Sequence, residues 1–218
     1  MQRSEKILLA SASPRRADLL RTAGITFEVV PADIDETPEP REEPEELVRR
    51  LSQLKALAVA KDHPDKIVLA ADTVVEHDGE LLGKPESEKH AFEILAALSG
   101  DSHEVMTGFS LIFPDGNVRT EVAVTEVEFR DLSKAEINAY IDSGDPMDKA
   151  GAYGIQSGAA GFVKSIAGSY TNVVGLPLAE VMGAIRNVGI PACDHDQREG
   201  NRNVGTPACD RNRRERIT

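Results

Sequence analysis

Apolar residues along the chain follow two different spacings. Continuous apolar runs, typical of buried strands, occupy 6–11, 25–31 and 66–79. Apolar residues three and four positions apart, typical of amphipathic helices, occupy 15–23, 44–63, 86–98, 133–144 and 175–189. Proline near the start of the first two of these helical segments fits the usual beginning of a helix. Strands and helices therefore alternate through residues 6–98.

The middle of the chain has a different pattern. Residues 103–132 predict two or three strands, with Asp115-Gly116 as a hairpin turn. Ser133 and Glu136 form a capping-box pattern at the start of the next helix, and residues 150–170 are glycine-rich with short strand-like runs. An alternating strand–helix region followed by a meander of strands predicts an α/β fold with a mixed sheet.

The composition fits a soluble globular protein. The chain has 218 residues, of which 40% are hydrophobic and 28% are charged, enough for one large domain or two lobes. No apolar run approaches the roughly 20 residues that span a bilayer, and we identify no signal peptide. The net charge of -12 and the 4% aromatic content argue against a nucleic-acid-binding surface. We expect a cytoplasmic protein with no membrane or nucleic-acid partner.

The C-terminal segment differs from the rest of the chain. RNVGIPACD at 186–194 recurs as RNVGTPACD at 202–210, and both copies are largely polar. The two cysteines, Cys193 and Cys209, lie here, which favours a reducing compartment over a disulfide-stapled secreted fold. We expect a folded domain over 1–186 and a flexible polar tail over 187–218.

The sequence SASPRR lies between the first predicted strand and the first predicted helix. A helix N-terminus that follows a strand offers free N–H groups and the positive end of the helix dipole to an anion. Ser11 and Ser13 add hydroxyl groups, and Arg15 and Arg16 add guanidinium groups that pair with phosphate oxygens. Two arginines in a first helical turn could instead be solvated surface. Cations are unfavourable at that position, so an anionic ligand explains them better.

Four further residues carry charges that a nucleotide site could use. Asp72 follows an apolar run, where an unpaired carboxylate is costly, and it could hold Mg²⁺, orient a water or simply cap a turn. Lys84 lies between Gly83 and Pro85 and could neutralise phosphate, although lysines are common on surfaces. Glu36, in an acidic loop, could join Asp72 as a magnesium ligand. Lys55 lies on the helix that follows this loop.

Residues 148–178 combine many small residues with the amide side chain of Gln156. Small residues let the backbone approach a ligand closely. Gln156 offers both a donor and an acceptor, which suits contact with the edge of a nucleotide base. The five histidines have no zinc-site spacing, and neither a serine-hydrolase nor a Cys–His pattern occurs in the sequence.

Six segments of the chain occur in the order seen in one protein family. They are SASPRR, AADTVV, GKP, LSG, DKAGAYGIQ and YTNVVGLPL. Over roughly residues 6–186 the chain resembles the Maf-like nucleoside triphosphate pyrophosphatases. The resemblance implies a two-lobed α/β fold with a mixed sheet and a central cleft, related to that of inosine triphosphate pyrophosphatases. It also implies a cytoplasmic homodimer that uses a divalent cation, Mg²⁺ or Mn²⁺, to hydrolyse a nucleoside triphosphate to the monophosphate and pyrophosphate.

The resemblance assigns roles to individual residues. It implies that Asp72 is the catalytic proton acceptor and that Arg15, Thr73 and Gln156 are specificity positions. The segment GAYGIQ resembles the branch of the family that acts on dTTP and UTP. Gln156 would then contact the pyrimidine, donating to a carbonyl and accepting from N3–H. The duplicated tail departs from the family pattern.

The same resemblance matches Glu36, Lys55 and Lys84 to other cleft residues, with Glu36 near the metal. We therefore expect Glu36 and Asp72 to hold the cation, and Asp72, Lys55 and Lys84 to act in catalysis. The expected substrate-binding residues are Ser11, Ser13, Arg15, Arg16, Thr73 and Gln156. A competing interpretation is a nucleotide-binding regulator of septum formation or cell division with little turnover.

Overall fold

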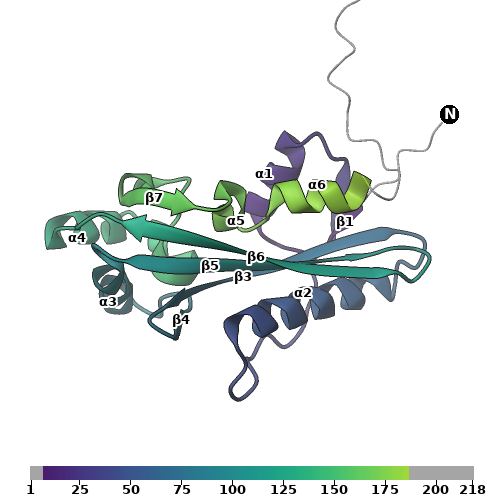
Figure 1. Cartoon of the computed structure of the whole chain (residues 1–218), viewed down its shortest axis with the longest axis horizontal. Coiled ribbons are helices and arrows are strands. Elements are labelled where there is room, and N and C mark those ends of the chain that lie inside the picture. The colour runs from purple at the N-terminus through teal and green to yellow at the C-terminus, as the bar shows by residue number, and fades with distance from the viewer. Residues whose placement is uncertain (1–6, 187–218) are drawn as a thin grey trace, which may run out of the picture.

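A single mixed sheet organises residues 7–186, which are the residues that the computed structural model describes (Figure 1). The seven strands are β1 (Ile7–Leu9), β2 (Phe27–Val29), β3 (Ile67–His77), β4 (Glu80–Leu82), β5 (Ser102–Ile112), β6 (Val118–Phe129) and β7 (Val163–Ala167). The sheet order is β2-β1-β3-β5-β6-β7, with β4 paired to β3. β1 runs parallel to β2 and β3, and the other pairs are antiparallel. The predicted mixed α/β fold is confirmed, whereas the predicted tail and its cysteines lie outside the described residues.

Helices cover both faces of this sheet. They are α1 (Pro14–Thr22), α2 (Pro44–Ala60), α3 (Glu88–Leu98), α4 (Lys134–Asp142), α5 (Tyr170–Val174) and α6 (Leu178–Arg186). In Figure 1, α2 lies below the long strands, α1, α5 and α6 lie above them, and α3 and α4 lie at one end. Three short 3-10 turns, η1 (Asp145–Asp148), η2 (Ala150–Ala152) and η3 (Gly158–Gly161), connect α4 to β7. No helix within residues 7–186 is long and apolar enough to cross a membrane.

The helix ends follow from the sequence. Proline occupies the first turn of α1 and α2, where its missing N–H has no partner to lose. The predicted capping box of α4 is present, because the Ser133 hydroxyl accepts from the Glu136 N–H while the Glu136 carboxylate accepts from the Ser133 N–H. These contacts set where the chain enters each helix.

The strand predicted over 66–79 is confirmed as β3, which is continuous from Ile67 to His77, and Asp72 pairs in register with Gly108 of β5. The last helix, predicted over 175–189, is present but begins later than predicted. Gly175 ends the preceding short helix α5 with a left-handed φ of 120°, Pro177 follows it, and α6 begins at Leu178.

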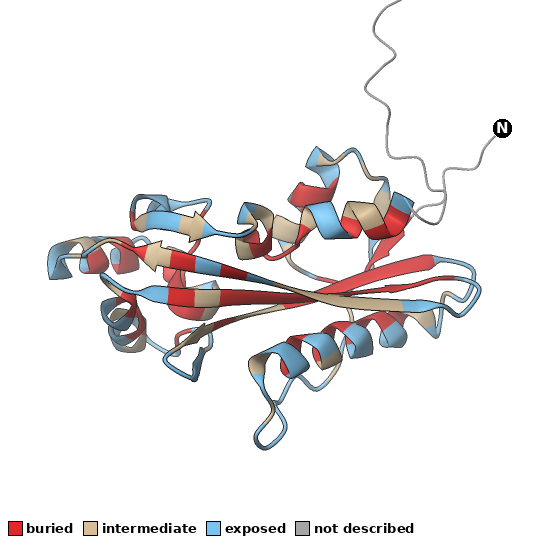
Figure 2. Ribbon diagram, viewed as in Figure 1, coloured by how far each residue is buried: buried red, intermediate tan, exposed pale blue. Residues whose placement is uncertain are grey.

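The apolar core lies on both sides of the long strands (Figure 2). One buried cluster fills the space between the sheet and α1, α3, α4 and α6, and a smaller one lies between the sheet and α2. Helix α2 comes so close to β5 that a Cβ atom on Gly108 would lie 2.3 Å from the carbonyl oxygen of Val48. This close approach brings the side chains of α2 next to the middle of β3, where Asp72 lies.

Candidate active site

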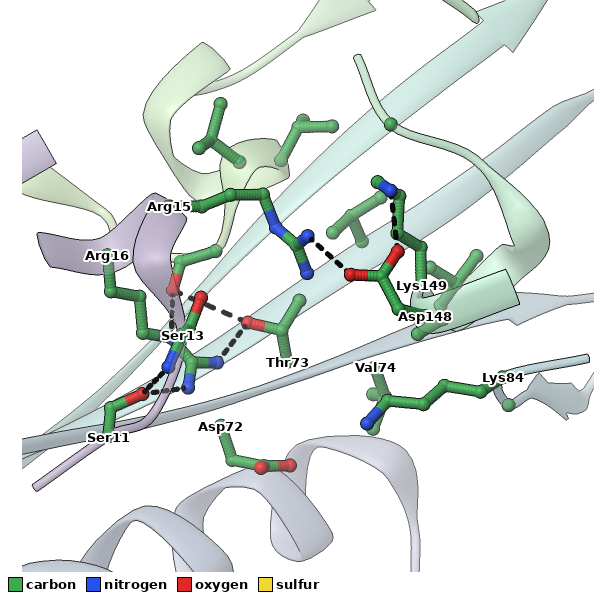
Figure 3. Close-up of a pocket in the computed structure, with 18 of the residues that line it drawn as sticks. Ser11, Ser13, Arg15, Arg16, Asp72, Thr73, Val74, Lys84, Asp148 and Lys149 are labelled. Carbon is green, nitrogen blue, oxygen red and sulfur yellow. Dashed lines mark hydrogen bonds and ion pairs between the residues drawn. The ribbon is translucent and has the colours of Figure 1, made fainter. Parts of the chain in front are cut away.

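A cavity of about 930 Å³ contains every site residue that the sequence predicts. It lies between the β1–α1 loop, the middle of β3, helix α2 and the loop 145–157 (Figure 3). The predicted residues that line it are Ser11, Ser13, Arg15, Arg16, Glu36, Lys55, Asp72, Thr73, Lys84 and Gln156. Residues far apart in the chain therefore meet in one place, although their roles remain predictions.

Arg16 is held by three oxygen atoms that carry no formal charge. Its Nε donates to the carbonyl oxygen of Gly175 (2.8 Å), its Nη1 to Ser11 Oγ (3.1 Å) and its Nη2 to Thr73 Oγ1 (3.0 Å). Burial lowers the pKa of Arg16, and the attraction of Asp72 acts in the opposite direction. An arginine stays protonated in proteins, so Arg16 presents a fixed positive charge to the cavity.

A chain of hydroxyl groups supports Thr73 from inside the sheet. Thr107 Oγ1 lies 2.9 Å from Thr73 Oγ1 and donates to the carbonyl oxygen of Asn172 (3.2 Å). Because a hydroxyl has only one proton to donate, Thr107 must accept from Thr73. Thr73 is then left as an acceptor for Arg16. The structure thus uses Thr73 to orient Arg16, a contact that sequence reasoning did not anticipate.

Arg15 has a different environment from its neighbour. Its Nη1 lies 3.4 Å from Asp148 Oδ2, and Asp148 also accepts from Lys149 Nζ at 2.6 Å. The Asp148 side chain is 68% exposed, so this is a solvent-accessible ion pair of small net value. Figure 3 shows Arg15 extending from α1 across the cavity towards Asp148. A phosphate group can therefore replace Asp148 as the partner of Arg15 at little cost.

Lys55 joins the two predicted metal ligands. Its Nζ lies 2.6 Å from Asp72 Oδ1 and 2.9 Å from Glu36 Oε1. Both Lys55 and Asp72 are 8% exposed, and such buried charges are tolerated only when they are paired. Among the described residues, the second oxygen of Asp72 accepts no hydrogen bond. Asp72 is thus held by one oxygen while the other is available to a ligand in the cavity.

Two predicted residues line the cavity without a side-chain partner. Within residues 7–186, neither Lys84 nor Gln156 makes a side-chain hydrogen bond or ion pair, and both are exposed. In Figure 3 the Lys84 side chain reaches into the cavity from the side opposite Arg15 and Arg16. Lys84 and Arg16 are the two cavity-lining cations in this part of the chain that have no carboxylate partner.

Sequence reasoning missed three charged residues of the site. Asp145, Asp148 and Lys149 line the cavity beside the predicted set. Asp148 and Lys149 are the first two residues of the segment DKAGAYGIQ, and Asp145 lies three residues before it, so this segment was the available signal. With them, five cations face four carboxylates around the cavity, and its charge is nearly balanced.

A second group of side chains of the types that bind metal ions lies elsewhere in the described region. Single ligand atoms of His77, Asp78 and Asp101 all lie within 4.8 Å of one another, at the β3–β4 turn and the α3–β5 loop. None of the three lines the cavity. This group is therefore separate from the predicted ligands Glu36 and Asp72.

The fold and the cavity define an α/β protein with a cavity lined by charged side chains of both signs, and comparisons identify its family. A family model described as Maf-like protein matches residues 6–188. A protein of Geobacter sp. (strain M21) named dTTP/UTP pyrophosphatase is 51% identical over 188 residues, covering 86% of this chain and 97% of that protein. A protein of the same name from Bacillus cereus is 46% identical over 186 residues, covering 85% and 91%. The chain belongs to the Maf-like protein family.

The expected relation to the inosine triphosphate pyrophosphatase fold is also confirmed. The Ham1 protein of Staphylococcus aureus, a structure of this ITPase-like type, superposes with a TM-score of 0.50 at 16% identity. The match covers 84% of this chain and 99% of that one. At this level of identity the likeness concerns the fold alone.

Proposed function

We propose that this protein hydrolyses dTTP and UTP, or modified pyrimidine nucleotides, to the monophosphate and pyrophosphate. The observation that carries the proposal is that Arg16, Lys84 and Asp72 line one cavity, with one oxygen of Asp72 available. Relatives named dTTP/UTP pyrophosphatase align along nearly their whole length, which supports the same reaction.

The triphosphate would bind at the N-terminus of α1. Ser13, the N-cap residue, makes no side-chain cap, so the first N–H groups of the helix are available to phosphate oxygens. Arg16 and Lys84 would add unpaired positive charge, and Arg15 would exchange Asp148 for a phosphate group. Ser11 and Ser13 would add hydroxyl donors.

The charge balance of the cavity supports a role for a divalent cation. Five cations and four carboxylates leave little net positive charge for a triphosphate, which carries several negative charges. Glu36 and Asp72 fit Mg²⁺ or Mn²⁺, because both carboxylates contact Lys55 and therefore lie close to each other, and such ions bind one or two carboxylates together with substrate phosphates. When bound there, the cation would neutralise phosphate charge and make bound water more acidic.

Asp72 would act as the base. Lys55 orients its carboxylate through Oδ1, and the other oxygen would accept a proton from a water molecule. As that proton leaves, the water oxygen bonds to the α-phosphorus and the bond from the α-phosphorus to the bridging oxygen breaks. Pyrophosphate departs with the electron pair of that bond, and Lys84 and the arginines would stabilise its charge. Lys55 would keep Asp72 in place throughout.

Replacement of Asp72 by Asn tests this function. Loss of a positioned base lowers rates by about 10²- to 10⁴-fold, so pyrophosphate release from UTP and dTTP with Mg²⁺ should fall at least that far. Asp142→Asn, an exposed position on α4 outside the cavity, is the matched control for loss of one carboxylate. Near-normal turnover by the Asp72 variant would remove Asp72 from the mechanism.

The regulator interpretation is not favoured, because the relatives are named as pyrophosphatases and binding alone does not need Asp72. Intact UTP and dTTP after incubation with protein and Mg²⁺ would revive it. We further propose that residues 1–186 form the catalytic domain and that the protein acts in the cytoplasm as a homodimer. Sedimentation of the full chain tests the dimer.

A further inference from the structure

Asp145 connects three side chains around the loop that carries Gln156. Its carboxylate accepts hydrogen bonds from Tyr140 Oη (2.5 Å), from Lys149 Nζ (3.1 Å) and from Ser157 Oγ. Its backbone carbonyl accepts a second bond from Lys149 Nζ at 2.6 Å. We call Asp145, Tyr140, Lys149 and Ser157 the Asp145 network.

The protonation states suit these contacts. Burial disfavours the charged form of Asp145, but hydrogen bonds from Ser157, Tyr140 and Lys149 outweigh burial and lower the pKa of this carboxyl. Burial and the bond to Asp145 raise the pKa of Tyr140, so its phenol keeps the proton that it donates. A charged acceptor makes these hydrogen bonds stronger than neutral ones.

The network holds the backbone on both sides of Gln156. On one side, the Gly154 N–H donates to Tyr140 Oη at 3.0 Å in a buried contact. On the other side, Ser157 donates to Asp145. A Cβ atom on Gly154 would lie 2.7 Å from Lys149 Cε and 2.7 Å from Ser157 Oγ, so the network packs tightly against this turn.

Gln156 itself has no side-chain hydrogen bond among residues 7–186, and it lines the cavity. Its position relative to a bound nucleotide therefore depends on the backbone at 154–157. We propose that Asp145 and Tyr140 are positioning residues for Gln156 and thereby determine discrimination between nucleotide bases. This inference rests on the proposed role of Gln156 in contacting the base.

The network also reaches the phosphate side of the cavity. Lys149 bonds to Asp148 as well as to Asp145, and Asp148 contacts Arg15. A charge change at Asp145 can therefore disturb both ends of the substrate. Within residues 7–186, the Tyr140 hydroxyl bonds to Asp145 and to the Gly154 N–H but to neither Asp148 nor Lys149, and Tyr140→Phe leaves the charge of Asp145 in place, so this variant separates base discrimination from phosphate binding.

The experiment compares kcat and KM for UTP, dTTP, GTP and ATP in the full-length chain with Mg²⁺. In Tyr140→Phe and Asp145→Asn, the preference for pyrimidine over purine nucleotides should fall about fivefold to tenfold, which lies within the range expected for the loss of one typical hydrogen bond. In Tyr140→Phe the loss should lie in KM for UTP and dTTP, with kcat for the purine nucleotides little changed, whereas Asp145→Asn should also raise KM for all four nucleotides. Ser157→Ala should show the same loss of preference for pyrimidine nucleotides, whereas Ser157→Thr, which keeps the hydroxyl, should retain the wild-type preference. Asp142→Asn is the matched control on α4.

The outcomes separate this inference from the proposed function. If the wild-type protein prefers pyrimidines and Tyr140→Phe keeps that preference, or loses activity equally on all four nucleotides, the inference is wrong and the proposed function stands. If the wild type releases no pyrophosphate from any of them, the proposed function and this inference both fail. Thermal unfolding identifies any variant that does not fold, and Tyr140→Phe, which removes one oxygen atom, then decides the question.

Discussion

The buried side chain of His103 should make the stability of the fold depend on pH. The residue is 2% exposed, its Nε2 lies 2.8 Å from Tyr153 Oη, and its ring packs edge-on against Phe129 with centroids 5.0 Å apart. Its Nδ1 is buried with no hydrogen-bond partner in the described part of the chain. A proton added there would be a buried, unpaired charge. Burial first, and repulsion from His77 second, lower the pKa of His103 from 6.5 to about 4.

The size of the stability change follows from the difference between the pKa values of His103 in the folded and unfolded chains. Between about pH 6.5 and pH 4 the unfolded chain binds a proton at this position and the folded chain does not. The contribution of His103 to stability is therefore fully present above pH 6.5, and it is lost as the pH falls, at about 1.4 kcal/mol per pH unit. By pH 4 the contribution to the free energy of unfolding has fallen by about 3 kcal/mol.

Urea unfolding of the wild type and of His103→Gln measures this contribution. Glutamine keeps a polar group towards Tyr153 but does not titrate. Between about pH 6.5 and pH 5, above the range in which most carboxylates titrate, the wild type should lose about 2 kcal/mol more stability than the variant. Equal losses in the two proteins, or an NMR titration of the His103 ring with a midpoint near 6.5, would refute the reasoning.

Three further predictions concern the sheet and the cavity. Gly108→Ala places a Cβ against the α2 backbone and should destabilise the fold by about 1–3 kcal/mol. Gly183→Ala lies in a helix, where the added Cβ has nothing within 4 Å, and it should stabilise the fold by about 0.5–1 kcal/mol. If urea unfolding ranks the two variants in the opposite order, the packing argument is wrong. In Arg16→Lys the ammonium cannot keep all three hydrogen bonds of the guanidinium, so the free energy of unfolding, measured by calorimetry, should fall by about 1 kcal/mol for each bond lost. The KM for UTP should also rise. Gln156→Ala should reduce the preference for pyrimidine over purine nucleotides in a pyrophosphate-release assay, and an unchanged ranking would refute its contact with the base.

The local parts of the fold could be predicted from the sequence because local physics determines them. The capping box at Ser133 and Glu136, the hairpin at Asp115-Gly116 and the prolines that begin α1 and α2 each act within a few residues. The alternation of strands and helices also predicted a mixed sheet. The partners of Asp72 were not predictable locally, since its pairing with Gly108 and its ion pair with Lys55 join elements that are distant in the sequence.

The site was predicted as a set of residues but not as a set of contacts. A motif names Arg15, but no local rule pairs it with Asp148, which lies 133 residues further along the chain. The hydroxyl of Thr73 was expected to contact substrate, yet Thr107 and Arg16 occupy it. Such pairings form where elements that are distant in the sequence meet at the cavity, so the pattern of any one segment does not predict them.

The consecutive arginines of SASPRR show why contacts matter more than residue type. Arg16 has only uncharged oxygen partners, so hydrogen bonding fixes its direction while its charge stays uncompensated and attracts an anion. Arg15 has a carboxylate partner, so an anion must displace Asp148 to reach it. The displaced Asp148 keeps Lys149 at 2.6 Å, and no unpaired carboxylate is left facing the phosphate. In the proposed function, Arg16 would therefore provide a fixed positive charge, and Arg15 would exchange Asp148 for a phosphate group while Asp148 stays paired with Lys149.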